Sequence, residues 1–217
     1  MKIKVCGLRL NEDIAAVSNS GADYIGLIFY PASSRYAAAI ADPNLLELVS
    51  KTNPKVKRVG VFVNTDAEEV RFTAEKYFLN AVQFHGDETP EYCSQFSNDY
   101  SVIKAFSIGE DFDFTQTESY EGICETFLFD TAGQLPGGNG FSWNWDMLSG
   151  YGGNTPFIVS GGIRQGDVLK VASIRHPQFM GIDINSGFEV YPGVKNTEAI
   201  NLFVRIIKAG EYEILSE

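Results

Sequence analysis

The sequence predicts an α/β fold, a single (β/α)8 TIM barrel with eight parallel strands. The first observation behind this prediction is the stretch 156–187, where two apolar runs flank a helical pattern and each run ends in a turn that contains glycine. A strand, a helix and a second strand at this length form a βαβ unit with parallel strands. The second observation is that strands and helices alternate in the same way along the whole chain, at intervals of roughly 20 to 30 residues.

The length of the chain fits this fold class. A barrel of this kind typically has about 250 residues and can form with about 200, so 217 residues allow only short loops. No linker or low-complexity segment interrupts the pattern, so we expect one domain over residues 1–217. Doubly wound folds also alternate strands and helices, but they usually stop at five or six strands.

The strands are predicted from short apolar runs that end at glycine or at polar residues. The run 24–29 is apolar almost throughout, as in a strand that is buried on both faces. In chain order the predicted strands are 3–6, 24–29, 58–63, 81–84, 102–106, 126–130, 156–160 and 179–184.

The helices are predicted from apolar residues at helical spacing and from residues that cap helix N-termini. Asn11, Asp42 and Thr89 stand where three of the helices begin, and the last helix carries its apolar residues on one face. In chain order the predicted helices are 11–20, 43–50, 67–78, 90–96, 111–120, 143–148, 168–174 and 196–208.

Composition disfavours several classes of function. The formal net charge is −11 and no basic stripe is visible, so we expect neither nucleic acid nor an anionic membrane as a partner. No apolar run approaches the roughly 20 residues of a membrane span, and the N-terminus lacks the apolar core of a signal peptide. Three cysteines, an odd number, give no disulfide framework, so we expect a reduced cytoplasmic protein.

Candidate functional residues stand at the carboxyl ends of the predicted strands, because these ends surround the active site of a barrel. The two turns that contain glycine, after the strands 156–160 and 179–184, offer backbone N–H groups that can hold a phosphate. The candidates are Cys6, Arg35, His85, Asp130, Gly161, Gly162, Asp183, Ser186 and Gly187.

Cys6 and Asp130 are the candidates for catalysis. Position alone leaves Cys6 open between a catalytic thiol and a small buried core residue. Asp130 could cap a turn, but the glycine-rich loop at 137–140 leaves space above its carboxyl group and favours catalysis. Cys93 and Cys124 do not end strands, so we interpret them as core thiols.

Arg35 and His85 are candidates for contacts with a ligand. An acidic protein with an anionic ligand needs a cation at the mouth of the barrel, and Arg35 could contact a carboxylate from the loop after the second strand. His85 could hydrogen-bond a substrate or orient a neighbouring loop. No second histidine or cysteine stands at metal-ligand spacing, so we expect no metal site.

Motifs at these strand ends, taken together and in their order, resemble those of the phosphoribosylanthranilate isomerase family. The resemblance extends from the first strand to the last helix. The motifs are KVCG at 4–7, QFHG at 83–86, FDT at 129–131, GGNG at 137–140, SGG at 160–162, DINSG at 183–187 and PGVK at 192–195.

The resemblance implies an isomerase of L-tryptophan biosynthesis. In this family an Amadori rearrangement converts N-(5-phosphoribosyl)anthranilate to 1-(2-carboxyphenylamino)-1-deoxyribulose 5-phosphate. The resemblance therefore implies a small anionic substrate, acid–base catalysis and no cofactor.

The resemblance also implies roles for the candidate residues. Cys6 matches the general base and Asp130 the general acid, while Arg35 matches the arginine that meets the anthranilate carboxylate. The residues expected to contact the rest of the substrate, with the phosphate at the glycine turns, are His85, Gly161, Gly162, Asp183, Ser186 and Gly187.

Four positions depart from the residues that the family commonly has. None of them is a proposed acid or base, so the departures concern the phosphate and loop contacts more than the reaction. They are Phe84, Asn139, Asn185 and Asn196, which replace leucine, threonine, serine and aspartate.

Two other interpretations remain open at this point. Another phosphate-binding barrel enzyme, such as indole-glycerol-phosphate synthase or a pentose-phosphate epimerase, would need catalytic lysine and glutamate residues or metal-binding histidines and aspartates. Lys104, within the fifth strand, is the only candidate lysine. The other interpretation is a catalytically silent barrel that binds a sugar phosphate or a protein partner. For the oligomeric state, monomer and homodimer both remain open.

Overall fold

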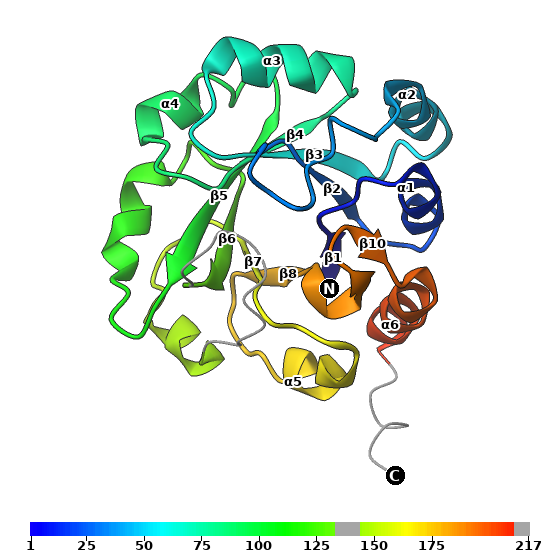
Figure 1. Ribbon diagram of the computed structural model, residues 1–217. Helices are drawn as coiled ribbons and strands as arrows, with labels where there is room; N and C mark the ends of the chain where they lie inside the picture. Colours follow the sequence, from blue (N-terminus) through cyan, green and yellow to red (C-terminus); the bar gives the residue numbers. More distant parts are fainter. Residues whose placement is uncertain (133–143, 211–217) are drawn as a thin grey trace.

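The computed structural model describes residues 1–132 and 144–210, and eight of its strands close into one barrel (Figure 1). The strands are parallel and pair in chain order, and the first also pairs with the eighth. The predicted fold class is therefore confirmed. The strands are β1 (Lys2–Val5), β2 (Tyr24–Ile28), β3 (Lys57–Phe62), β4 (Ala81–Phe84), β5 (Ser101–Ile108), β6 (Thr126–Thr131), β7 (Phe157–Val159) and β8 (Phe179–Ile184).

Helices lie around the outside of the barrel (Figure 1). The α-helices are α1 (Asn11–Ser18), α2 (Pro43–Thr52), α3 (Ala67–Lys76), α4 (Pro90–Ser94), α5 (Val168–Ala172) and α6 (Thr197–Ala209). The 3-10 helices are η1 (Phe114–Tyr120), η2 (Trp145–Gly150), η3 (Gln165–Asp167) and η4 (Ser186–Phe188).

Alternate residues of each strand face opposite sides of the barrel wall. On β2, Ile25 and Leu27 pack outward in the large core cluster that includes the helices. Tyr24 of the same strand packs inside the barrel, in a cluster made of strand residues. Side chains that point into the barrel therefore line its mouth at the carboxyl end of each strand.

Helix starts follow the capping residues in most cases. The side chains of Asp42 and Thr89 accept hydrogen bonds from the backbone N–H groups two and three residues further on, as predicted. The prediction for Asn11 was wrong, because the cap position of α1 is Leu10. The Asn11 side chain instead accepts a hydrogen bond from the backbone N–H of Asp42 and ties α1 to the start of α2.

Two predicted helices are 3-10 helices that start later than expected. η1 begins at Phe114 because the Asp113 side chain accepts a hydrogen bond from the Thr115 N–H. η2 begins at Trp145, behind the equivalent cap of Asn144. A short capped segment can close with i to i+3 hydrogen bonds without forming a full α-helix.

A two-stranded antiparallel sheet after β8 was not predicted. It consists of β9 (Glu189–Tyr191) and β10 (Val194–Lys195), which lie between η4 and α6. The sheet brings Glu189 and Lys195 toward the mouth, where both meet residues of the site described below.

Two features are absent from the described residues. No helix among them combines the length and the apolar character that a membrane crossing requires. Residues 1–132 and 144–210 also hold no group of three or more histidine, cysteine, aspartate or glutamate side chains arranged to bind a metal ion.

Candidate active site

A cavity opens at the carboxyl ends of the barrel strands. Its empty volume is about 840 Å³, including space open to solvent. All predicted site residues except Arg35 line it. They are Cys6, His85, Asp130, Gly161, Gly162, Asp183, Ser186 and Gly187.

Cys6 stands directly after β1, with its sulfur inside the barrel. Its backbone N–H donates to the Ile184 carbonyl at 2.9 Å, which continues the pairing of β1 with β8. The side chain packs with Ile28 and Val61 and is 4% exposed. This burial raises the pKa of the Cys6 thiol, because a thiolate there loses its hydration.

Lys4 lies two residues before Cys6 and therefore faces the same side of the strand. Its Nζ atom donates to Oδ2 of Asp183 at 3.1 Å, and both side chains are buried. The second oxygen of Asp183, Oδ1, is buried and has no hydrogen-bond partner among the described residues. Burial raises the pKa of Asp183, although the Lys4 charge acts in the opposite direction.

The sequence reading did not identify Lys4. Lys4 could have been identified, because it stands between apolar residues and two positions before Cys6. At this spacing its side chain points to the same side of the strand as that of Cys6, into the barrel.

Asp130 and His85 meet across the mouth. The Nε2 atom of His85 lies 3.5 Å from Oδ2 of Asp130. The other ring nitrogen, Nδ1, contacts the amide nitrogen of Gln83 at 3.1 Å. Asp130 Oδ1 accepts a hydrogen bond from the Thr131 backbone N–H at 2.9 Å, so both carboxyl oxygens have a neighbour that orients them.

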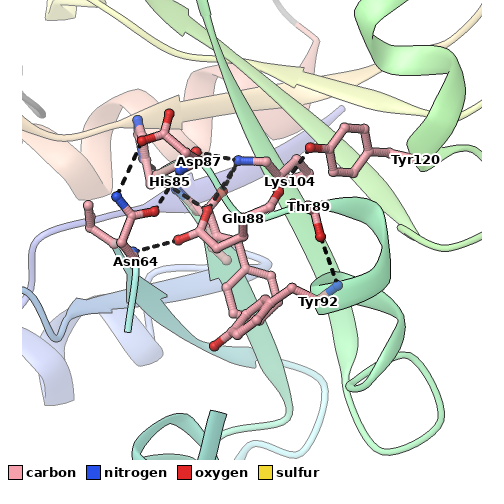
Figure 2. A network of polar contacts seen from close by, with 12 residues as sticks. Asn64, His85, Asp87, Glu88, Thr89, Tyr92, Lys104 and Tyr120 are labelled. Atoms are coloured by element: carbon pink, nitrogen blue, oxygen red, sulfur yellow. Dashed lines mark hydrogen bonds and ion pairs between the residues drawn. The ribbon is translucent and has the colours of Figure 1, made fainter. Parts of the chain in front are cut away.

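A network of polar contacts fixes the loop that follows His85 (Figure 2). The Glu88 carboxylate accepts hydrogen bonds from the backbone N–H groups of Asn64 at 2.8 Å and Gly86 at 2.9 Å. Lys104 Nζ donates to the Gly86 carbonyl at 2.7 Å and lies 3.2 Å from Glu88 Oε2. With these partners, Lys104 supports the loop and does not line the cavity next to Cys6.

The two turns that contain glycine lie side by side in the wall of the cavity, after β7 and β8. Gly161 and Gly162 have φ angles of 95° and 67°, in the left-handed region that glycine adopts most easily. The backbone N–H groups of Gly161, Gly162, Ser186 and Gly187 donate to no residue in the described part of the chain. They are therefore available to an anion.

Arg35 is held by a carboxylate of the protein itself. Its Nε and Nη2 atoms donate to both oxygens of Glu189, at 2.7 to 3.1 Å, and the residue is 7% exposed. Lys195 Nζ donates to the same carboxylate at 2.8 Å and to Asn185 Oδ1 at 2.7 Å. Burial raises the pKa of Glu189, but the hydrogen bonds and charges of Arg35 and Lys195 outweigh it and lower the pKa below its ordinary value.

This pairing could not be predicted, because Glu189 lies on the small sheet that was not predicted. The guanidinium of Arg35 uses one edge on Glu189, and its Nη1 atom takes no part in that contact. The loop at 137–140, with Asn139, lies outside the described residues.

Comparison with known sequences gives one family. Residues 3–206 match the family described as N-(5'phosphoribosyl)anthranilate (PRA) isomerase. The chain is 42% identical to N-(5'-phosphoribosyl)anthranilate isomerase of Phocaeicola vulgatus, over 96% of this chain and 98% of that protein. It is 41% identical to the protein of the same name from Parabacteroides distasonis, over 95% and 93%.

Solved structures give the same result. The crystal structure of phosphoribosyl anthranilate isomerase from Thermotoga maritima has a TM-score of 0.82 and 32% identity, covering 96% of this chain and 99% of that one. A crystal structure of such an isomerase in complex with reduced 1-(o-carboxyphenylamino)-1-deoxyribulose 5-phosphate has a TM-score of 0.79 and 31% identity, with the same coverage.

Proposed function

The chain belongs to the N-(5'-phosphoribosyl)anthranilate isomerase family, and from this membership we propose how its residues carry out the reaction. The chain is an isomerase of tryptophan biosynthesis that rearranges N-(5-phosphoribosyl)anthranilate to 1-(2-carboxyphenylamino)-1-deoxyribulose 5-phosphate. Family membership decides against the synthase and epimerase interpretations. The roles of individual residues are the subject of the proposal.

The first step opens the furanose ring. Asp130, as general acid, gives a proton to the ring oxygen. The bond between that oxygen and C1 breaks, and the lone pair of the anthranilate nitrogen forms a C1=N iminium. His85 supports this assignment, because its Nε2 atom lies 3.5 Å from the Asp130 carboxyl group and both residues line the cavity.

The second step removes the proton from C2. The Cys6 thiolate takes this proton, the C2–H electron pair forms a C1=C2 bond, and the iminium electrons return to nitrogen. The resulting enol then becomes the ketone when C1 gains a proton and the C2 hydroxyl loses one. A thiolate is a stronger base than a carboxylate, so Cys6 suits this step better than Asp130.

One observation carries the assignment. Cys6 and Asp130 line the same cavity from β1 and β6, and the strands between them on one side, β7 and β8, end in the two glycine turns. A substrate whose phosphate binds at those turns has its sugar between the acid and the base. The free N–H groups of Gly161, Gly162 and Gly187 support this phosphate position.

Other groups complete the proposed substrate contacts. The Asp183 Oδ1 atom, which is buried without a partner and lines the cavity, is suited to accept a hydrogen bond from a sugar hydroxyl. Arg35 remains the proposed contact of the anthranilate carboxylate, through the guanidinium edge that Glu189 does not use.

Three further statements belong to this proposal. We propose one domain, since elements of the barrel extend from β1 to α6. We also propose a cytoplasmic location and a monomer or a homodimer in solution. A relative from Thermotoga maritima is described as dimeric, which supports the second alternative.

The test is an assay that follows the loss of phosphoribosylanthranilate fluorescence, with purified wild-type enzyme and the Cys6→Ser and Asp130→Asn variants. The proposal requires activity in the wild type and a large loss of kcat in both variants. A wild type with no activity would favour the silent barrel, and an active Cys6→Ser variant would remove Cys6 as the base.

A further inference from the structure

Lys4, the buried lysine two residues before Cys6, has no role in the reaction described so far. We propose that Lys4 is a positioning residue whose ammonium group supplies the cation for the Cys6 thiolate, with Asp183 as its counter-charge. This inference rests on the proposed role of Cys6 as general base.

The first support is the common direction of the two side chains. Lys4 and Cys6 stand two residues apart at the carboxyl end of β1 and both face the inside of the barrel. Gly26 on β2 makes room for both of them. A Cβ atom at this position would lie 2.9 Å from the Cys6 sulfur and 3.1 Å from Lys4 Nζ. The ammonium group and the sulfur therefore share the space above one glycine, where the Lys4 charge acts on the thiol.

The second support is the electrostatic state of Lys4. Burial acts to lower the pKa of Lys4, but the charge of Asp183 and the contact with Cys6 outweigh it, so the pKa lies above its ordinary value. Lys4 therefore stays protonated inside the barrel. A lysine buried without such partners would tend to lose its proton.

The third support is the set of charges around the sulfur. Among them, Lys4 is the strongest influence that favours the thiolate, Lys195 acts in the same direction more weakly, and Asp183 opposes both. The neighbouring residues from β2 and β3 carry no charge. The titratable groups that face Cys6 or line the same cavity are Lys4 from β1, Asp183 from β8, Lys195 from β10, Tyr30 after β2, His85 after β4 and Asp130 from β6.

These charges resolve a conflict within the site. Burial raises the pKa of Cys6, yet a general base must be deprotonated. A fixed cation beside the sulfur recovers part of the lost hydration energy of the thiolate. Asp183 keeps the pair neutral while Cys6 is a thiol, so that Lys4 can be buried in the resting enzyme.

The experiment measures the charge state of Cys6 without turnover. The rate of alkylation by iodoacetamide is followed against pH in the free enzyme, and peptide mass spectrometry assigns the modification to Cys6 rather than to Cys93 or Cys124. The variants are Lys4→Met and Asp183→Asn. Lys104→Met serves as the matched control, because Lys104 is also a buried lysine paired with a carboxylate but does not line the Cys6 cavity.

We expect the midpoint of alkylation to move in opposite directions in the two variants. Lys4→Met should raise it by about 1 to 3 pH units, the effect of losing a nearby opposite charge. Asp183→Asn should lower it, because the carboxylate opposes the thiolate. Lys104→Met should leave it unchanged. If Lys4 had a purely structural role, the two variants would not shift the midpoint in opposite directions. An unchanged midpoint in a folded Lys4→Met enzyme would overturn the proposal.

A second comparison covers the case in which Lys4→Met fails to fold, because it leaves Asp183 buried alone. The double variant Lys4→Met with Asp183→Asn retains neither charge, and its midpoint should lie above that of Asp183→Asn; equal midpoints would overturn the proposal. A different result would contradict the proposed function. If Cys6→Ser keeps its kcat, Cys6 is not the base even where the alkylation shifts are seen. If Cys6→Ser is inactive and the shifts are missing, only the role of Lys4 is wrong.

Discussion

The Nε2 atom of His85 lies 3.5 Å from Oδ2 of Asp130. His85 follows β4 and Asp130 lies near the end of β6, so that β5 stands between the two strands. The other ring nitrogen, Nδ1, lies 3.1 Å from the amide group of Gln83. The imidazole is therefore held between Gln83 and the proposed general acid.

We expect His85→Ala to lower kcat by about 10- to 100-fold, or about 1.4 to 2.8 kcal/mol, because the Asp130 carboxyl group loses a neighbour that orients it. Steady-state kinetics of the single variant measure this loss. In an Asp130→Asn background the same substitution should cost much less, because the two residues act through one contact. Equal losses in both backgrounds would show that His85 acts independently of Asp130.

The acid and the base should be separable by kinetics. Cys6→Ser and Asp130→Asn should each reduce kcat by about 10² to 10⁴, the usual contribution of a positioned acid or base, with a much smaller change in KM. A substrate analogue supplied as the ring-opened imine should restore part of the activity of Asp130→Asn and none of that of Cys6→Ser. Rescue of both variants would contradict the division of roles.

Arg35→Ala should weaken substrate binding by about 1.5 to 3 kcal/mol, the range for hydrogen bonds to charged groups. A competitive inhibitor with and without the anthranilate carboxylate provides the measurement, since only the carboxylated compound should lose affinity. Because Arg35 also holds Glu189, thermal unfolding of the variant is needed as a control. Equal losses for both compounds would assign Arg35 to the support of Glu189 alone.

Gly162→Ala should raise KM for the phosphorylated substrate, because a methyl group at a φ of 67° disturbs the turn whose N–H groups face the cavity. Gly122→Ala is the matched control. Its φ is 76°, and a Cβ there meets no atom within 4 Å, so it carries the same backbone strain away from the site. Isothermal titration with inorganic phosphate compares the two. Similar phosphate affinities in the two folded variants would show that the phosphate does not bind at this turn.

Stability should depend on pH through Asp23. Burial acts to raise the pKa of Asp23, but hydrogen bonds from Lys208, Lys2 and the Ile3 backbone outweigh it, so the pKa is lowered in the folded state. The carboxylate therefore stabilises the fold above its unfolded pKa of about 3.9, and this contribution is lost as the pH falls through the lower folded value.

Urea denaturation at pH 7 and near pH 3 tests this dependence. Asp23→Asn should be less stable than the wild type at pH 7, and the difference should shrink at the lower pH. Glu47→Gln, which removes the exposed partner of Lys51, should change little at either pH. A difference for Asp23→Asn that is the same at both pH values would contradict the assignment.

The strands and most helix starts could be predicted because their signals are local. An apolar run such as 24–28 and a capping residue such as Asp42 or Thr89 determine a strand or a helix start from a few neighbouring residues. Asn11 misled the same rule, because its side chain bonds to the N–H of a residue 31 positions away.

Pairings between distant side chains could not be read in this way. Arg35 meets Glu189 across 154 positions, and Lys4 meets Asp183 across 179. Strand parity shows that Lys4 points inward, but neither periodicity nor composition names the carboxylate that receives it. Catalytic candidates were found because barrels collect them at strand ends. The charged partners around them come from segments far apart in the sequence.

The pairing of β1 with β8 also has a consequence for synthesis on the ribosome. The edge of β1, from Lys2 to Val5, stays unpaired until residues 181–184 have been made, which takes roughly 10 to 40 s at ordinary elongation rates. A free strand edge is a template for association with other nascent chains, and an inward-pointing charge discourages such pairing. Lys4 is such an inward-pointing charge on β1, and its carboxylate partner, Asp183, lies on the strand that closes the barrel.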